Sequence, residues 1–283
     1  MSKELAKLFA SRFIQRSDVK AVQLSRDAGT LHMGDWFPDT KIDEAKRPNN
    51  PHLPHGFKME HLLAHLAGER TYGHYLLSPD NNCKVFVFDI DLEKCIDDKG
   101  NKTGTWVSMN AETVHEGVSP RELWMDRRAT EPRNWYKYQM KMLSHKIARQ
   151  VRELGIDCAV SYSGSKGVHV YGMTGSLPAQ EVREAAMLVL DLIDEFEPMR
   201  GKNFFRHRND DPVHGFQNFS IEVFPKQDSL DGKSLGNLVR LPLGTNFKNP
   251  KDPTFFLDMT APIGQFKPHP DPVALLKSGE CFA

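Results

Sequence analysis

Two aspartates close an apolar segment of the sequence. The run from Lys84 to Asp91 is rich in β-branched and aromatic residues and ends in Asp89 and Asp91, a pattern that predicts a central strand. Because residues two apart in a strand point to the same face, we expect both carboxylates to project together. A divalent cation between them relieves their repulsion, and Mg²⁺ and Mn²⁺ prefer oxygen ligands. The pair therefore predicts a metal site suited to nucleotidyl transfer.

A pair of aspartates with this spacing is not specific for one reaction. Glycosyltransferases, phosphatases of the haloacid dehalogenase type and calcium loops use similar pairs, and acids at an exposed strand end are often only solvated. Such phosphatases normally continue into glycine and threonine, whereas Leu92, Glu93 and Lys94 follow here. A non-catalytic nucleic-acid-binding module is a further alternative, although no strand carries the aromatic-glycine pattern of an RNA-recognition motif. A DxD-type phosphohydrolase and a binding module therefore stay as alternatives.

A glycine-containing turn with a lysine lies between two predicted strands. Residues Ser163 to Gly167 read S-G-S-K-G, in which glycines permit close backbone approach, hydroxyls and amides donate to anionic oxygens, and Lys166 adds charge. The turn is not a P-loop, because a strand rather than a helix follows the lysine. His169 lies two residues beyond Gly167, where its side chain can face the same cleft. A lone histidine in a strand is usually structural, but its place on this hairpin favours binding of a triphosphate.

The elements around these residues predict an α+β domain. Apolar residues recur at helical spacing over residues 134–154 and 178–196, and two short strands at 157–160 and 168–173 form a hairpin. Further strands are predicted at 219–224 and 237–241. Because strands and helices do not alternate strictly, we expect a mostly antiparallel sheet with helices packed against it. We also expect a helical N-terminal region over residues 1–80 and a core over residues 81–283, within one continuous unit.

Composition excludes several classes of protein. Lysine plus arginine equals aspartate plus glutamate at 37 each, so net charge indicates no polyanionic partner and nucleic-acid contacts must come from local patches. The four cysteines form no C-x-x-C pair, which argues against a zinc knuckle or a disulfide framework. No stretch approaches the roughly 18 continuous apolar residues of a membrane span. We therefore expect a cytoplasmic protein with no membrane partner.

The order of these motifs resembles a known superfamily. The sequence D-I-D, then S-G-S-K-G-V-H-V-Y, then an acid in a later strand is similar to the three motifs of the archaeo-eukaryotic primases, which include primase-polymerases and the polymerase domains of bacterial end-joining ligases. Residues 221–228 and 236–244 resemble the F-P-x-Q-D and G-N-L-h-x-L-P-L segments of primase domains from prokaryotic conflict systems, mobile elements and CRISPR-associated primase-polymerases. The resemblance extends from about residue 8 to about residue 250.

The resemblance implies a reaction and the residues that perform it. A mostly antiparallel sheet like that of an RNA-recognition motif would carry Asp89, Asp91 and Glu222, which would hold two divalent ions, Mg²⁺ or Mn²⁺. A 3′-hydroxyl would attack the α-phosphate of an NTP or dNTP on a DNA template with a primer, and pyrophosphate would leave. Helicase, nuclease or other modules of a replication, repair or defence system are the implied partners. The implied nucleotide-binding residues are Ser163, Ser165, Lys166, Gly167, His169 and Arg240.

Two departures from the family and one basic cluster complete the prediction. Many relatives carry a cysteine-rich zinc-binding insertion, but here no cysteine precedes Cys83, and the third acid is Glu222 where aspartate is common. For Arg240 the alternative to phosphate binding is a salt bridge to an acid. Basic residues interleaved with two phenylalanines predict contacts to a template strand through phosphates and base stacking, with a solvated surface loop as the alternative. These basic residues are Lys202, Arg206 and Arg208.

Overall fold

A seven-stranded antiparallel sheet forms the centre of the computed structural model, which describes residues 3–27, 30–38, 56–92, 95–96, 102–106, 114–116, 120–207, 219–232 and 235–283. The α+β prediction with a mostly antiparallel sheet is confirmed. In spatial order the strands are β10 (Phe196–Arg200), β11 (Phe204–His207), β12 (Phe219–Phe224), β4 (Asn82–Leu92), β9 (Gly167–Pro178), β8 (Asp157–Tyr162) and β14 (Phe255–Phe256).

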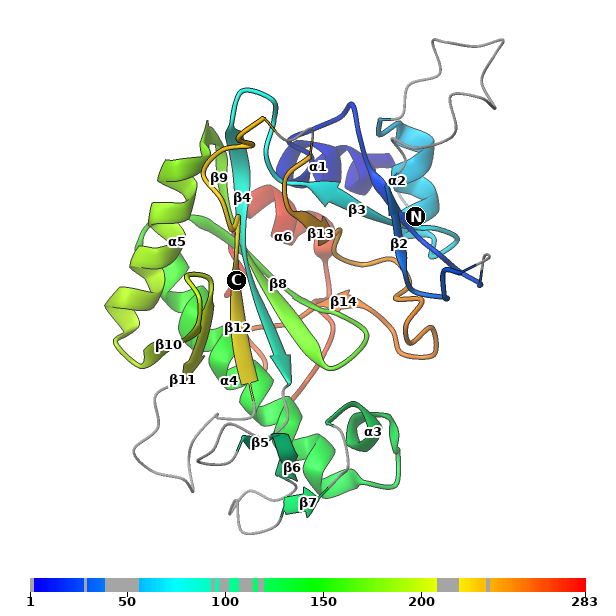
Figure 1. Cartoon of the computed structure of the whole chain (residues 1–283), viewed down its shortest axis with the longest axis vertical. Coiled ribbons are helices and arrows are strands. Elements are labelled where there is room, and N and C mark those ends of the chain that lie inside the picture. The colour runs from blue at the N-terminus through cyan, green and yellow to red at the C-terminus, as the bar shows by residue number, and fades with distance from the viewer. Residues whose placement is uncertain are drawn as a thin grey trace.

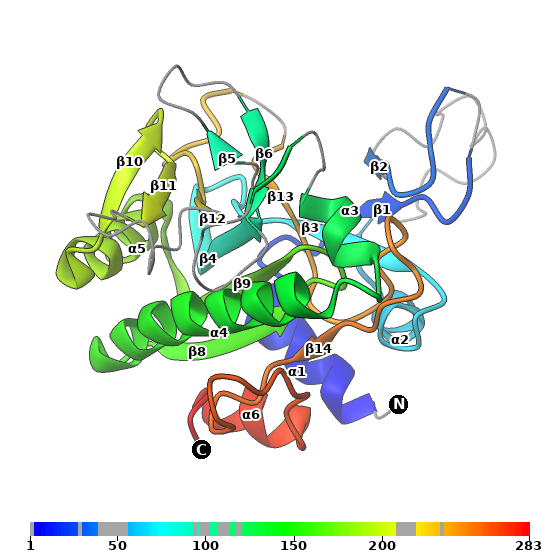
Figure 2. The same cartoon turned by 90° about the horizontal axis from the view of Figure 1, so that it is seen from below.

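Two long helices cover one face of this sheet. The helix α4 (Thr130–Glu153) packs on β8 and β9, and α5 (Ala179–Ile193) packs on β4 and β9 (Figures 1 and 2). Phe86, Phe88 and Ile90 of β4 are fully buried in the resulting core. The predicted helix over 178–196 ends three residues earlier, where Asp194 adopts φ 51° and the chain enters β10.

A second, four-stranded sheet covers part of the opposite face. It has the order β13 (Leu238–Arg240), β3 (Thr71–Tyr75), β1 (Ala21–Gln23) and β2 (Trp36–Pro38), and all its pairs are antiparallel. Residues 1–80, expected to be helical, therefore contribute three strands beside the helices α1 (Lys3–Phe13) and α2 (Met59–Leu66) (Figure 1). Phe13 meets Tyr171 of β9 edge to face at 5.2 Å, so α1 shares the core of the large sheet.

Three further features complete the described chain. A three-stranded sheet is formed by β5 (Cys95–Ile96), β6 (Lys102–Trp106) and β7 (Val114–Glu116). Two short helices follow later, α3 (Pro120–Met125) and α6 (Pro272–Ser278). Of the helices in the described ranges, none combines the length and apolar character required to span a bilayer.

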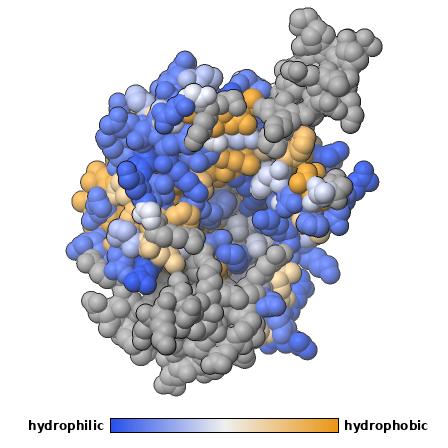
Figure 3. Space-filling view, in the orientation of Figure 1, coloured by the Kyte–Doolittle hydropathy of each residue, from blue (hydrophilic) through white to orange (hydrophobic). Residues whose placement is uncertain are grey.

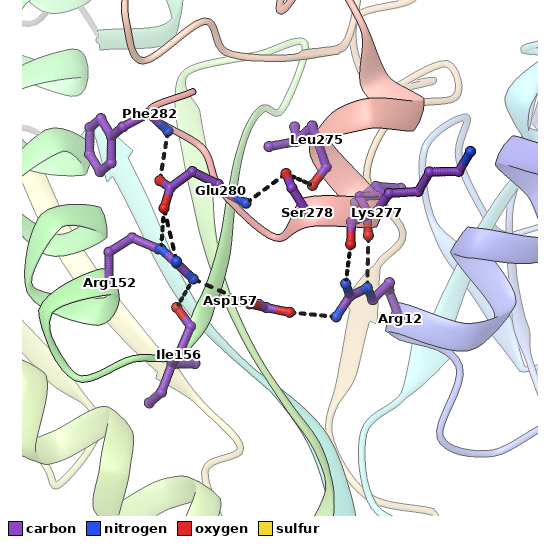
Figure 4. A network of polar contacts seen from close by, with 10 residues as sticks. Arg12, Arg152, Ile156, Asp157, Leu275, Lys277, Ser278, Glu280 and Phe282 are labelled. Atoms are coloured by element: carbon purple, nitrogen blue, oxygen red, sulfur yellow. Dashed lines mark hydrogen bonds and ion pairs between the residues drawn. The ribbon is translucent and has the colours of Figure 1, made fainter.

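A polar network joins the end of α6 to α1, α4 and β8 (Figure 4). Asp157, the first residue of β8, accepts from Arg12 of α1 at 2.7 Å and from Arg152 of α4 at 3.2 Å. Arg12 also donates to two carbonyl oxygens at the end of α6, and Arg152 pairs with Glu280 at 2.8 Å. Gly279 ends α6 with φ 68°, and a Cβ there would lie 2.1 Å from the Asp157 carboxyl carbon. The position therefore requires glycine for its backbone and for its space.

We predict that Gly279→Ala destabilises the fold more than Gly155→Ala. Gly155 follows α4 with φ 75°, but a Cβ there would meet no atom within 4 Å. Its replacement should cost only the left-handed penalty of about 1–2 kcal/mol. The Gly279 variant should cost about 1–3 kcal/mol more, because the carboxylate of Asp157 must move as well. Urea unfolding of both variants measures the difference, and equal free energies of unfolding would contradict the close approach.

Candidate active site

Three predicted site residues lie side by side on adjacent strands. The register pairs Asp89 of β4 with Glu222 of β12 on one side and with His169 of β9 on the other. Cross-strand partners project to the same face, so their side chains form one row across the sheet. Asp91 lies in the next row on that face, opposite Gly167. The two aspartates, the hairpin and the third acid are thus brought together from three strands.

The alternation of β4 explains why this part of the sheet is polar. From Val85 to Phe88 every side chain is fully buried, because both faces of the sheet are covered there. From Asp89 onward only the face covered by the helices stays apolar, with Ile90 and Leu92 buried and the two aspartates partly exposed. The predicted metal site therefore lies where the second face of the sheet is no longer covered.

Lys166 is directed at Asp91. Its ammonium group lies 2.8 Å from Asp91 Oδ2 and 2.9 Å from the carbonyl oxygen of Leu92. The approach is close because Gly167 has no side chain: a Cβ there would lie 2.3 Å from Asp91 Oδ1. The lysine that the motif assigns to a triphosphate thus neutralises a carboxylate when no ligand is bound.

The pKa values of the two aspartates diverge. Burial acts to raise the pKa of Asp89, but the positive charges of His169, Lys166 and Arg240 outweigh it and leave that pKa below its usual value. Burial and the charge of Asp89 raise the pKa of Asp91 to about 6, against the opposing charge of Lys166. The repulsion between the two carboxylates is therefore expressed as the raised pKa of Asp91.

His169 connects Asp89 to a buried tyrosine. Its Nε2 lies 3.2 Å from Asp89 Oδ1, and its Nδ1 lies 2.9 Å from the hydroxyl of Tyr171. Tyr171 is fully buried, and burial raises the pKa of its hydroxyl, which stays protonated. Because the hydroxyl of Tyr171 engages Nδ1 and its ring packs edge to face on the imidazole, Nε2 faces the carboxylate row.

Glu222 is held by a lysine from its own strand end. Lys226 forms an ion pair with Glu222, and its ammonium group also lies 5.2 Å from the ring centre of Phe204 and 4.8 Å from that of Phe224. Such a cation over aromatic faces is stabilised by their π-electrons. The third acid is therefore adjacent to Asp89 in register but paired with a cation.

The donor set fits a divalent ion in its chemistry. Among the residues that the structure describes, no group of three or more histidine, cysteine, aspartate or glutamate side chains is arranged to hold a metal. Nevertheless Asp89 Oδ1 is a buried carboxylate oxygen with the imidazole of His169 3.2 Å away, and the charge of Asp91 is disfavoured by its neighbour. Both conditions are relieved by an oxygen-preferring cation. Asp89 and Asp91 would hold it, with Glu222 joining once its side chain leaves Lys226.

The row opens onto a cavity of about 330 Å³. The face of the molecule that Figure 1 presents is hollowed near its centre in the space-filling view (Figure 3). Predicted residues that line the cavity are Asp89, Asp91, Ser163, Ser165, Lys166, His169 and Arg240. Residues that sequence reasoning did not assign to it are Gln23, Trp36, Phe224, Leu238, Val239, Asn246 and Lys248. The N-terminal strands and the segment around β13 thus supply the wall opposite the acids.

Arg240 lines the cavity, and its guanidinium contacts the backbone of the hairpin and of its own segment. Its guanidinium donates to the carbonyl oxygens of Ser163 at 2.9 Å and Leu243 at 3.2 Å. Asn246 donates to the same Ser163 oxygen at 2.9 Å. Two buried donors on one carbonyl fix the start of the hairpin, and no sequence motif signalled Asn246 for this task.

Part of the predicted basic cluster is in register with the acids, because Arg206 of β11 lies opposite Ser220 of β12, which lies opposite Asp91. Arg206 pairs with Glu197 across the β10–β11 hairpin at 2.6 Å, and Arg208 lies outside the described residues. Lys202 lines a separate groove of about 490 Å³ beside α5, together with Arg183 and Phe205. These strands were not expected, and their pairing places Arg206 beside Glu197.

Comparison with known families gives one match. The model of the archaeo-eukaryotic primase domain of the TOTE conflict system matches residues 4–281. No curated protein matches the chain significantly. The matched range includes every predicted site residue and both walls of the cavity.

We predict that Lys166→Met raises the affinity for Mn²⁺. The substitution removes a cation that competes for Asp91, and a partly exposed ion pair of this kind corresponds to a gain of about two- to fivefold. Titration calorimetry at pH 8 without nucleotide measures it. Lys277→Met is the control, because Lys277 also pairs with an acid, Glu4, but at an exposed position. Weaker Mn²⁺ binding by the Lys166 variant would contradict the competition.

We predict that Asp91→Asn stabilises the metal-free protein at pH 8. The raised pKa of Asp91 means that the folded state favours the protonated acid, so stability from this group falls as pH rises from about 4 through about 6. The advantage of the variant should therefore shrink below pH 6. We expect on the order of 1 kcal/mol, because the carboxylate is 37% exposed and solvent screens it. Urea unfolding in a chelator, with Asp80→Asn as a surface control, measures the trend; equal stabilities at pH 8 would contradict it.

Proposed function

Because the chain belongs to the archaeo-eukaryotic primase domain family of TOTE conflict systems, we propose that it is a DNA-directed primase-polymerase. Membership of the family indicates an enzyme of the primase or nucleotidyltransferase type, a class that generally uses divalent metals. The proposal adds a DNA template, a primer and NTP or dNTP substrates. The observation that carries it is the row of Glu222, Asp89 and His169 across adjacent strands, beside a cavity that Lys166 lines.

The acidic side of the cavity would hold the reacting phosphate. Asp89, Asp91 and Glu222 would bind two divalent ions, Mg²⁺ or Mn²⁺, which supply neutralisation of charge at the α-phosphate and on the departing pyrophosphate. The 3′-hydroxyl of a primer, or of a first nucleotide, attacks the α-phosphorus, and the bond to the pyrophosphate oxygen breaks. The carboxylates would orient these groups, since β4 and β12 are fixed in the middle of the sheet.

The hairpin side would hold the triphosphate. Ser163, Ser165 and Lys166 line the cavity next to the acids, and Gly167 permits the close approach of this turn to β4. When Asp91 is occupied by a metal, Lys166 becomes available for a phosphate oxygen. His169 Nε2 faces the same space and would donate to the triphosphate, held in place by Tyr171.

The opposite wall would receive the nucleoside. Trp36 and Leu238 offer apolar surface, whereas Asn246 and Lys248 are polar, a mixture typical of ligand pockets. The cavity volume of about 330 Å³ lies within the range of small-molecule sites. Base and sugar would therefore lie between the four-stranded sheet and the hairpin, with the triphosphate towards the acids.

Contacts to the template remain a prediction for Lys202 and Arg206. Arg206 must leave Glu197 to reach a phosphate, and Lys226 must likewise leave Glu222. If Glu222 binds a metal, Lys226 would be released beside Phe204, which makes these two residues a further cation and ring for a DNA strand. Modules such as a helicase or nuclease of the same conflict system are the proposed protein partners.

A template-directed extension assay tests the proposal. A primed and an unprimed DNA template are incubated with NTPs or dNTPs and with Mg²⁺ or Mn²⁺. Metal-dependent extension of chains complementary to the template supports it. Hydrolysis of a phosphomonoester with no extension would support a phosphohydrolase instead.

We predict that Asp89→Ala lowers extension by about 10³-fold or more, on the scale of removing a catalytic group. The fold should persist, because the substitution removes one of two repelling carboxylates, and thermal unfolding checks this. Asp80→Ala, which removes an exposed acid on a turn, should extend primers at the wild-type rate. Extension by the Asp89 variant near that rate, with the metal present, would contradict the assignment.

A further inference from the structure

His65 lies outside the cavity but is tied to its wall. It is in the last turn of α2 and has no exposed surface. The backbone N–H of Tyr72 donates to His65 Nδ1 at 3.2 Å, and Nε2 lies 3.0 Å from the carbonyl oxygen of Pro242. Burial lowers the pKa of His65 to about 4, so the ring is neutral near pH 7. Because Nδ1 accepts, the single ring proton is on Nε2, which donates to Pro242.

The turn that His65 contacts has an unusual backbone. Leu243 and Gly244 both lie in the left-handed region, with φ 63° and 66°. A Cβ on Gly244 would lie 2.5 Å from the imidazole, so the ring and the turn are in direct contact. A leucine in this conformation is strained and persists only where the surroundings hold it.

Three threonine hydroxyls hold the same turn. Thr71 donates to the carbonyl oxygen of Thr245, and Thr254 donates to that of Gly244. The hydroxyl of Thr245 in turn donates to the carbonyl oxygen of Gly68 at 3.0 Å. The segment that connects α2 to β3 therefore contacts the turn from one side through hydrogen bonds. His65 lies within this contact.

The turn carries the donors that fix the hairpin. Arg240 precedes it and donates to its Leu243 carbonyl oxygen, and Asn246 follows it. Both side chains donate to the carbonyl oxygen of Ser163 at 2.9 Å. A shift of the turn would move both donors together and release the first residue of the S-G-S-K-G turn.

We propose that His65 is a positioning residue for the nucleotide pocket: through its bond to Pro242 and its contact with Gly244 it holds Arg240 and Asn246 on Ser163. The effect is transmitted through packed, hydrogen-bonded groups and needs no contact with substrate. The effect of His65 on nucleotide binding and KM rests on the proposed function. Its effect on the position of the Ser163 hairpin does not.

The test compares three variants. His65→Leu removes both hydrogen bonds, and His65→Gln keeps a side-chain N–H that can reach Pro242. His74→Leu is the matched control, because His74 is also fully buried in β3 with a pKa lowered to about 4, and its polar contact is to the backbone of Phe13 in α1. Amide hydrogen exchange over residues 163–167, metal-dependent binding of a non-hydrolysable dNTP, and KM and kcat are measured for each.

We expect His65→Leu to speed amide exchange in the hairpin and to raise both the nucleotide Kd and KM by about tenfold or more, with kcat changed by less than about threefold. His65→Gln should recover most of the loss, and His74→Leu should match the wild type. If His65→Leu does not fold, Thr245→Val, which removes the hydroxyl bond to Gly68 from the same turn, takes its place beside His65→Gln.

Folded variants with wild-type hairpin exchange and wild-type KM would overturn the inference, as would an equal effect of His74→Leu. If even the wild type fails to extend a primer, the proposed function is contradicted. Faster hairpin exchange confined to the His65 and Thr245 variants would still support the positioning role in that case.

Discussion

The repulsion between two carboxylates on one strand face constrains this molecule more than any other interaction. Asp89 and Asp91 project together because a strand repeats every two residues, and no backbone adjustment within β4 can separate them. Two basic side chains lie against the pair, Lys166 at Asp91 and the imidazole of His169 at Asp89. Residual repulsion remains in the raised pKa of Asp91. In the proposed function, a divalent metal would replace these basic side chains as the partner of the two carboxylates.

The large sheet makes that balance possible by holding the strands rigidly. Helices α4 and α5 bury one face, so β4 has fully buried neighbours in Phe88 and Ile90 on either side of Asp89. The acids cannot retreat from each other into solvent without breaking a central strand. Burial of the helix-covered face therefore provides the stability, and the open end of the other face provides the chemistry.

The four-stranded sheet and the segment after β13 complete the site, although they lie far from the acids in the sequence. Trp36 and Gln23 come from the N-terminal strands, whereas Arg240 and Asn246 lie more than two hundred residues further along the chain. These segments meet because β13 pairs with β3, which places the turn of Gly244 on His65. The hairpin at Ser163 is then held from the second sheet rather than by its own strands alone.

The sequence by itself determined the local parts of this arrangement. The strand ending in Asp89 and Asp91, the hairpin around Ser163 and the strand carrying Glu222 follow from periodicity and turn chemistry, which act over a few residues. The α+β class and the family resemblance were also readable, since both depend on the order of such motifs.

Only the tertiary structure determined which residues from distant parts of the chain contact one another. The pairing of β13 with β3 depends on contacts between residues far apart in the chain. The β10–β11 pairing, which places Arg206 beside Glu197, also depends on contacts outside a local motif. For the same reason Arg240 binds backbone carbonyls rather than an acid, and Lys226 covers Glu222. A side chain's partner is set by the packing of whole elements, and burial then fixes which polar groups must satisfy one another; neither is encoded within the local window that a motif occupies.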